Sequence, residues 1–285
     1  MAYQNGTASD YLDLLKKLED FAVLQGWTVQ RSTYDEVGGT DGELILDGPG
    51  VNDDQNIIVG IKSYHDVGSD YYNWEFKGAR IYDGETYDNM VQDSNARYLP
   101  LWNDSIPYWL ICNKQRIALV AKVSTVYMHL YLGYINPYAA DFEYDYPLLI
   151  GGSSASSTAR WSNTGLNAYW ASGQGHGYLW TPDDTWRQIG TSTDNVRIWP
   201  WMDANTGNQD SLRDTFGDYP LFPPVLMIPT SNNVEGHLGE LDGVRHITGF
   251  SLGTEDIVDT GTQDYLVAQN TLRNDIHDFM ALELA

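Results

Sequence analysis

The sequence contains a single cysteine, Cys112, among its 285 residues. One thiol excludes a disulfide within the chain and any zinc site built from several thiolates. Cys112 ends the apolar stretch that begins at Tyr108. In such a stretch a cysteine acts as a small hydrophobic side chain, so we expect it to be buried.

Basic residues are also scarce, because 16 Lys and Arg stand against 39 Asp and Glu and the formal net charge is −23. This balance excludes a protein that binds nucleic acid by neutralising its phosphates, so no direct nucleic-acid partner is expected. The acidic residues are spread along the chain and do not form a tail. Such a solvated acidic surface suits high ionic strength, where salt screens repulsion between like charges.

Long hydrophobic runs are absent. The apolar run 117–123 is interrupted by Lys122 and is far shorter than the ~18 residues that cross a bilayer. Residues 1–10 lack the basic start and the apolar segment of a secretory signal. The sequence therefore predicts a protein without a membrane partner, made and folded in a cytoplasm.

Sequence motifs for catalysis are missing as well. The chain has no Gly-x-Ser-x-Gly nucleophile elbow, no phosphate-binding loop and no dinucleotide fingerprint after a strand. Its six histidines include no i, i+4 pair, and none lies in a zinc-ligand spacing with Cys112. We therefore predict that the protein is not an enzyme and has no catalytic residues, no metal site and no cofactor.

Aromatic residues, in contrast, are abundant. The chain has 10 Trp, 20 Tyr and 7 Phe, and aromatic residues make up 13% of it. A chain so rich in large apolar side chains is folded. Its length corresponds to about two domains at roughly 150 residues each, although an all-β chain of this size often forms one unit.

One helix is expected, at residues 9–25. Leucine, phenylalanine and alanine recur there with the i, i+3, i+4, i+7 spacing of an apolar helix face. Ser9 is the expected N-cap, and Asp10 and Asp13 suit the positive end of the helix dipole. Gly26 is expected to end the helix.

The rest of the chain alternates short apolar segments with clusters of Gly, Asp, Asn and Pro, a pattern typical of strands joined by turns. We therefore predict a mainly-β (α+β) fold of antiparallel β-sheets or a β-sandwich, with one N-terminal helix and a loop-rich lobe that contains tryptophan. Strands are expected at residues 27–31, 43–46, 56–64, 71–76, 79–82, 107–113, 115–123, 125–135, 225–228, 243–249, 265–269 and 279–284.

Two of these segments allow a closer prediction. Residues 107–123 read as a β-hairpin that turns at Asn113-Lys114, with Asn113 supplying a positive φ. In residues 125–135 aliphatic side chains alternate with Tyr127, His129 and Tyr131. Because neighbouring side chains of a strand point to opposite faces, one face is expected to be aliphatic and the other aromatic.

Composition changes near residue 150, where prolines are followed by a Gly/Ser-rich stretch. We therefore predict three regions. Residues 1–150 form the helix and a β domain, residues 151–224 an irregular, aromatic-rich lobe or insertion, and residues 225–285 the strands that complete the β core.

Four tryptophans of this lobe permit two interpretations: Trp180, Trp186, Trp199 and Trp201. Exposed on loops, they would stack on sugar rings, and the protein would be a carbohydrate-binding receptor module. Alternatively they pack the lobe or a subunit interface, where tryptophan is also enriched. A third hypothesis is a glycoside hydrolase, but with 39 acidic residues a suitable carboxylate pair arises by chance.

The acidic pairs Asp53-Asp54 and Asp183-Asp184 also permit two interpretations. Each could contribute to a calcium site, but neither has the alternating oxygen ligands and the glycine of an EF-hand loop. Solvated turns are the simpler interpretation of both pairs.

The segment from Tyr127 to Ser154 resembles a family of uncharacterised virion structural proteins of tailed bacteriophages. The resemblance lies in Tyr-Leu-Gly-Tyr-Ile-Asn-Pro-Tyr at 131–138 and Tyr-Asp-Tyr-Pro-Leu-Leu-Ile-Gly-Gly-Ser-Ser at 144–154. The N-terminal helix, the segment 99–123 and the C-terminal strands are similar to the same family. The resemblance covers most of the chain and includes no catalytic motif.

This resemblance implies a structural subunit of the virion, in the tail at its baseplate or neck rather than in the capsid. Its partners would be other virion proteins and copies of itself, arranged as a ring or trimer. Aromatic residues are enriched at such interfaces. The residues expected to form the assembly interface, with core and turn positions as the alternative, are Tyr131, Tyr134, Tyr138, Tyr144, Tyr146 and Pro147.

The net charge leads to a first prediction. Because salt screens repulsion among the acidic side chains, the free energy of unfolding is expected to be higher in molar NaCl than in dilute buffer. Urea unfolding followed by tryptophan fluorescence at several salt concentrations measures it. Greater stability in dilute buffer would contradict an acidic surface adapted to salt.

Overall fold

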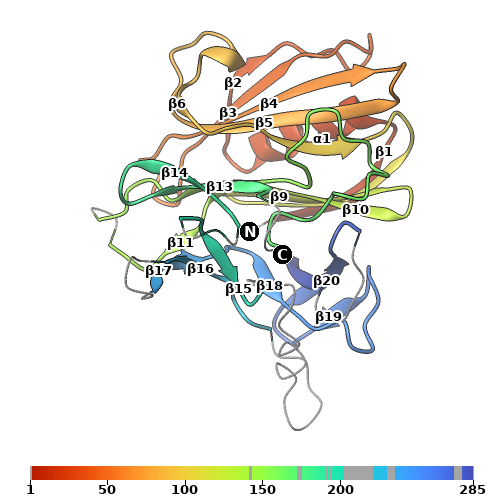
Figure 1. Cartoon of the computed structure of the whole chain (residues 1–285). Coiled ribbons are helices and arrows are strands. Elements are labelled where there is room, and N and C mark those ends of the chain that lie inside the picture. The colour runs from red at the N-terminus through yellow and green to blue at the C-terminus, as the bar shows by residue number, and fades with distance from the viewer. Residues whose placement is uncertain are drawn as a thin grey trace.

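The computed structural model describes residues 2–140, 143–171, 175–190, 192, 194–201, 221–229, 235–272 and 278–284. These residues form four antiparallel β-sheets, with a single α-helix near the N-terminus. Figure 1 shows the sheets stacked in three layers. The predicted mainly-β fold with one N-terminal helix is confirmed.

A seven-stranded sheet forms the central layer (Figure 1). Its strand order is β1-β8-β9-β10-β12-β13-β14, so β1 and β14 are its edges. The strands are β1 (Ala2–Ala8), β8 (Ile106–Cys112), β9 (Arg116–Val123), β10 (Val126–Tyr134), β12 (Leu148–Gly151), β13 (Gly177–Thr181) and β14 (Thr185–Gln188).

The upper layer is a second sheet of order β2-β3-β4-β5-β6, in which β5 also pairs with β7. A short 3-10 helix, η1 (Tyr87–Asn89), precedes β6. The strands are β2 (Thr28–Ser32), β3 (Glu43–Gly48), β4 (Ile57–Asp66), β5 (Tyr71–Ile81), β6 (Val91–Asp93) and β7 (Arg97–Leu101).

The lower layer consists of two four-stranded sheets, ordered β11-β17-β16-β15 and β18-β21-β20-β19. The predicted C-terminal strands therefore cover the central sheet and do not extend it. The strands are β11 (Asn136–Pro137), β15 (Arg197–Trp199), β16 (Val225–Pro229), β17 (Glu235–Glu240), β18 (Val244–His246), β19 (Ile257–Asp259), β20 (Asp264–Gln269) and β21 (Phe279–Leu284).

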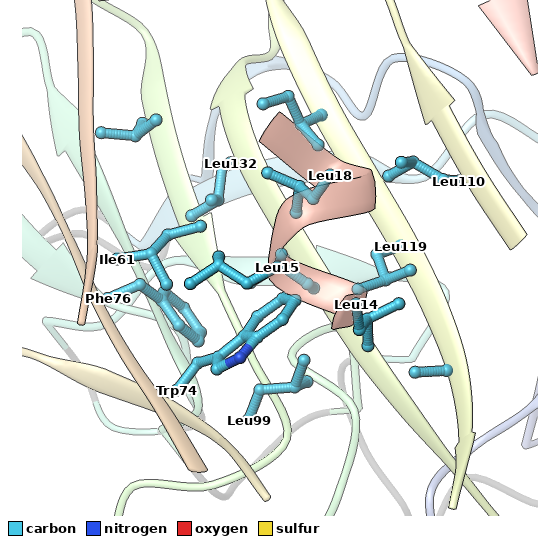
Figure 2. Packing of buried hydrophobic residues seen from close by; sticks show 14 of the residues in the cluster. Leu14, Leu15, Leu18, Ile61, Trp74, Phe76, Leu99, Leu110, Leu119 and Leu132 are labelled. Carbon is cyan, nitrogen blue, oxygen red and sulfur yellow. The ribbon is translucent and has the colours of Figure 1, made fainter. Parts of the chain in front are cut away.

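Helix α1 (Tyr11–Leu24) lies between the upper and the central layer. Figure 2 shows its leucines Leu14, Leu15 and Leu18 between side chains of both sheets. All three leucines are at most 1% exposed. The apolar stripe predicted from the sequence is therefore confirmed. Its side chains fill the space between the two sheets. No described helix is long and apolar enough to span a membrane.

The predicted N-cap of helix α1 is wrong, whereas its predicted C-terminal end at Gly26 is confirmed. The N-cap is Asp10, not Ser9, because the Asp10 carboxylate accepts hydrogen bonds from the amides of Leu12 and Asp13. An aspartate also favours the positive end of the helix dipole. At the other end Gly26 has φ +96°, so it ends the helix as predicted.

The predicted hairpin forms from β8 and β9, with Cys112 opposite Ile117. Asn113 shapes its turn differently from the prediction: it is not among the described residues with positive φ. Its side-chain oxygen instead accepts hydrogen bonds from the amides of Gln115 and Arg116, both 2.9 Å long. An Asx turn thus replaces the left-handed residue.

Strand β10 separates two hydrophobic cores. Met128, Leu130 and Leu132 belong to the core that contains α1, whereas Tyr127 and Tyr131 belong to the core facing the lower layer. Every residue of β10 is buried. The predicted division into an aliphatic and an aromatic face is confirmed, and both faces are covered.

Other segments differ from the sequence prediction. Residues 71–76 and 79–82 belong to one strand, β5. The strands that were not predicted are β1, β6, β7, β11, β12, β13, β14, β15, β17 and β19. The boundary expected near residue 150 does not divide the β structure either. The β13–β14 hairpin extends the central sheet and β15 joins the lower layer, although residues 202–220 of the predicted lobe lie outside the described residues.

A buried ion pair joins the central sheet to the lower layer. Arg116 at the start of β9 has a fully buried side chain, and its Nε lies 2.8 Å from Oδ2 of Asp242, in the turn after β17. Asn113 and Gln115 also donate hydrogen bonds to this carboxylate. Burial alone would raise the pKa of Asp242, but Arg116 and these hydrogen bonds outweigh it and lower the pKa.

Gly243 shows how closely this pair is packed. It has φ +68°, and a Cβ atom there would lie 1.9 Å from Nη2 of Arg116. Only glycine fits both the backbone conformation and the space.

This pair leads to a second prediction. Asp242→Asn removes the negative charge that pairs with the buried guanidinium of Arg116, and we expect the free energy of unfolding to fall by about 3–5 kcal/mol. Asp53→Asn is the matched control, because Asp53 forms an exposed pair with Lys114 whose loss costs under about 1 kcal/mol. Urea unfolding measures both variants.

The same ion pair makes the free energy of unfolding depend on pH in the acidic range. The pKa of Asp242 is lowered in the folded state. The ionised carboxylate therefore contributes its full stabilisation above the pKa that Asp242 has in the unfolded chain, and this stabilisation is lost as the pH falls through the pKa of the folded state. The stability difference between wild type and Asp242→Asn should therefore shrink below about pH 4. Equal losses in the Asp242 and Asp53 variants would contradict the role of the pair.

Candidate functional site

Five of the six residues predicted to form an assembly interface are buried in this chain: Tyr131, Tyr134, Tyr144, Tyr146 and Pro147. The hydroxyl groups of Tyr131, Tyr144 and Tyr146 donate hydrogen bonds within the chain. Tyr131 donates to the carbonyl of Tyr134 at 2.8 Å, and Tyr144 donates to the carbonyl of Trp180. These residues are core positions, which corrects the docking surface expected from the sequence, because their rings hold the central sheet against its neighbours.

Tyr138 is the exception among the six. It follows β11, its side chain is 52% exposed, and its hydroxyl donates to Oε1 of Glu240 at 2.7 Å. It therefore remains a residue that a partner could contact.

The four tryptophans of the alternative prediction do not form one surface. Trp180 and Trp186 pack edge to face across the β13–β14 hairpin, with ring centroids 5.5 Å apart. Trp201 is buried in the other core, 4.5 Å from the ring of Trp170, whereas Trp199 is 37% exposed. Packing explains Trp180 and Trp201, so the structure does not bring these four residues together as a sugar platform.

A pocket of about 350 Å³ opens between the upper and central layers, beside Arg80. The Arg80 guanidinium lies 4.4 Å from the ring centre of Tyr146 and 5.5 Å from that of Trp180. It also pairs with Asp145 at 3.5 Å, and Asp54 lines the same pocket. With its one cation held by two rings and a carboxylate, this pocket does not offer an uncompensated charge to an anion.

The acidic pairs lie in turns. Asp183 connects β13 to β14 and accepts hydrogen bonds from Arg187 and from Thr181. The hydrogen bond from Arg187 lowers the pKa of Asp183 to about 2. Asp53 pairs with Lys114 at 2.6 Å. Among the described residues no three metal-ligating side chains come together.

A second pocket, of about 640 Å³, lies where the loop after β12 passes His176. His176 is 4% exposed, and burial lowers its pKa to about 4. Its Nδ1 lies 2.6 Å from the carbonyl oxygen of Asn167. Because that oxygen only accepts, Nδ1 carries the proton and Nε2 keeps its lone pair. At neutral pH the imidazole is therefore an uncharged acceptor with one fixed tautomer.

A network of buried hydrogen bonds holds Asn167, the partner of His176, in place. The side-chain oxygen of Asn167 accepts from Asn270 at 3.2 Å, and Oδ1 of Asn270 accepts from the amides of Ala168 and Thr271. Asn270 and Thr271 are fully buried. Hydrogen-bonded groups of this kind hold a side chain in one orientation.

The remaining feature is the outer edge of the central sheet. Among the described residues, β1 pairs with β8 alone. Its sequence, Ala-Tyr-Gln-Asn-Gly-Thr-Ala, has neither charge nor proline, and Asn5, Gly6 and Thr7 are exposed. Each other edge strand of the described sheets contains a residue that discourages pairing: Arg187 in β14, Arg31 in β2, Asp93 in β6, Arg97 and Pro100 in β7, Pro137 in β11, Arg197 in β15, Arg245 in β18 and Asp259 in β19.

Neither β1 nor the His176 pocket was predicted. The polar segment at residues 2–8 has too little alternation to indicate a strand, although Tyr3 and Thr7 favour β structure. The spacing of histidines along the chain indicates metal-ligand motifs and cannot indicate a single buried imidazole. Cys112, in contrast, agrees with its prediction: it is 1% exposed, and burial raises the pKa of its thiol to about 12.

Comparison with known proteins does not assign this chain to a family. No protein-family model matches it, and no curated protein matches it significantly.

The core positions of the tyrosines lead to a third prediction. The buried Tyr146 hydroxyl donates to the carbonyl of Ala79 on β5, so Tyr146→Phe removes a buried hydrogen bond and should cost about 1–3 kcal/mol. Tyr138→Phe, whose hydroxyl is at the surface, should change stability by less than about 0.5 kcal/mol. Urea unfolding measures both variants. A larger loss of stability in Tyr138→Phe than in Tyr146→Phe would contradict the core position of Tyr146.

Proposed function

We propose that this protein is a structural subunit of a tailed-bacteriophage particle, placed in its tail at the baseplate or neck. The subunits associate with copies of one another as a ring or trimer and contact other virion proteins. The observation that carries the assembly part of this proposal is strand β1, an edge of the described central sheet that contains neither a charge nor a proline. The phage part rests on the resemblance of the sequence to virion structural proteins.

The residues that carry the resemblance belong to the framework of the molecule. Segment 131–138 runs along β10 into β11, and segment 144–154 contains β12. Both segments lie where the central sheet contacts its covering layers, and their tyrosines are mostly buried. Because the similar residues lie in these framework positions, the resemblance supports a fold shared with the virion proteins. Assembly of a virion protein depends on that fold.

An edge strand offers a row of backbone N–H and C=O groups to any strand that approaches it. Natural proteins protect such edges with charges, prolines or a covering segment. In this chain the other described sheet edges carry a charge or a proline, whereas β1 carries neither. The contrast supports β1 as the edge that pairs with a neighbouring subunit, in the manner of strand addition.

The net charge of −23 controls when this pairing happens. Identical acidic subunits repel each other over about 10 Å at 0.1 M salt. Backbone pairing acts only at contact, so the subunits stay apart in dilute solution and associate where salt or a neighbouring component removes the repulsion. This behaviour suits a part that must remain soluble before it joins a particle.

The proposal leads to a fourth prediction. The wild-type protein should form trimers or closed rings in sedimentation velocity, with association rising with salt, and Asn5→Lys combined with Thr7→Lys should shift it to monomer. Thr28→Lys is the control, since Thr28 is also exposed, on β2, an edge that already contains Arg31. The control should associate like the wild type.

Two results would overturn the proposal. A wild-type protein that stays monomeric across concentration, salt and added tail proteins would contradict assembly. Immunogold labelling of purified particles with an antibody against this chain should mark the tail or neck, and unlabelled particles would contradict its place in the virion.

A further inference from the structure

The pocket beside His176 is built from residues that carry no charge at neutral pH. Besides the histidine, the described residues that line it are Ser154, Ala155, Ser156, Ala159, Ser162, Asn163, Thr164, Gly165 and Leu166. This composition is unusual in a chain with a net charge of −23. A pocket lined by hydroxyls, an amide and a neutral imidazole gives no electrostatic preference to an ion.

The floor of the pocket contains an acceptor that the protein does not use. Nδ1 of His176 is occupied by the carbonyl of Asn167. Nε2 makes no hydrogen bond to the described residues. It is not one of the completely buried side-chain atoms that have no partner, so part of its surface is accessible. Since His176 lines the pocket and is otherwise buried, its accessible nitrogen faces this space. A fixed lone pair there accepts from an O–H or N–H group.

The rim of the pocket supplies further polar groups. The side chains of Ser162, Asn163 and Thr164 are exposed and make no hydrogen bond to other described residues. Ser154 and Ser156, in contrast, are used within the loop, because the Ser154 hydroxyl accepts from the amide of Ser156 at 3.0 Å. Two hydroxyls and one amide on the rim thus accompany one acceptor on the floor.

The loop that forms the pocket is held in place by the upper layer. Asn73 on β5 is fully buried and donates from Nδ2 to the carbonyl oxygens of Ser157, at 3.2 Å, and Ala159, at 2.9 Å. Tyr64 also donates to Ser157, and Arg160 pairs with Asp70. A site fixed in this way loses little conformational entropy when a ligand binds.

We propose that this pocket binds a neutral saccharide, with one sugar hydroxyl donating to Nε2 of His176 and others contacting the rim at Ser162, Asn163 and Thr164. The volume of about 640 Å³ lies within the range of small-molecule sites. Ala155 is the exposed apolar residue of the lining, and it can contact the C–H groups of a sugar ring. This site differs from the tryptophans considered from the sequence, and it does not depend on the assembly at β1.

The test uses the full chain with four neutral disaccharides as probes: maltose, cellobiose, lactose and diacetylchitobiose. Saturation-transfer NMR at millimolar sugar should show transfer to at least one of them, and the same sugar should shift the ¹⁵N resonance of His176 Nε2. His176→Phe should weaken binding about tenfold, as expected for one hydrogen bond of ~1.4 kcal/mol.

A second pair of variants keeps the test valid if His176→Phe fails to fold. Thr164→Val replaces a rim hydroxyl by a methyl group and should weaken binding severalfold. Thr262→Val is its matched control, because Thr262 is exposed in the turn between β19 and β20, and it should bind like the wild type. The proposal is wrong if none of the four sugars gives saturation transfer, or if binding persists in Thr164→Val and is lost in Trp186→Ala.

Discussion

The constraint on which the structure depends is that both faces of the central sheet are buried. Strands β9 and β10 alternate between two hydrophobic cores, so neither face can be left to solvent. An antiparallel sheet usually needs only one covered face. Here the upper sheet with α1 covers one face and the two lower sheets cover the other, which explains why 285 residues form three layers.

Polar groups occupy the places where these layers meet. Arg116 and Asp242 join β9 to the turn after β17, and the network around Asn270 joins the loop after β12 to the end of β20. A buried charge or amide is costly unless it is paired, so these junctions specify one arrangement of the layers. Apolar contacts alone would tolerate small shifts between sheets.

The features that can interact with other molecules lie at the periphery of this arrangement. Strand β1 is one edge of the central sheet, and His176 immediately precedes β13, next to the opposite edge. Four strands of the central sheet, β8, β9, β10 and β12, lie between β1 and β13. The interior is filled by tyrosine, tryptophan and aliphatic side chains, and most aromatic residues that suggested a docking surface serve there as packing.

The sequence by itself determined the mainly-β class, helix α1 with its apolar stripe and Gly26 end, the 107–123 hairpin and the two faces of β10, because these depend on local spacing and turn chemistry. Only the tertiary structure decided that Tyr131 and Tyr146 are buried, that residues 177–188 extend the central sheet, and that β1 is an edge of that sheet among the described strands. Burial and edge position depend on which distant segments pack together, as at Arg116 and Asp242. Residue spacing along the chain carries no information about such contacts.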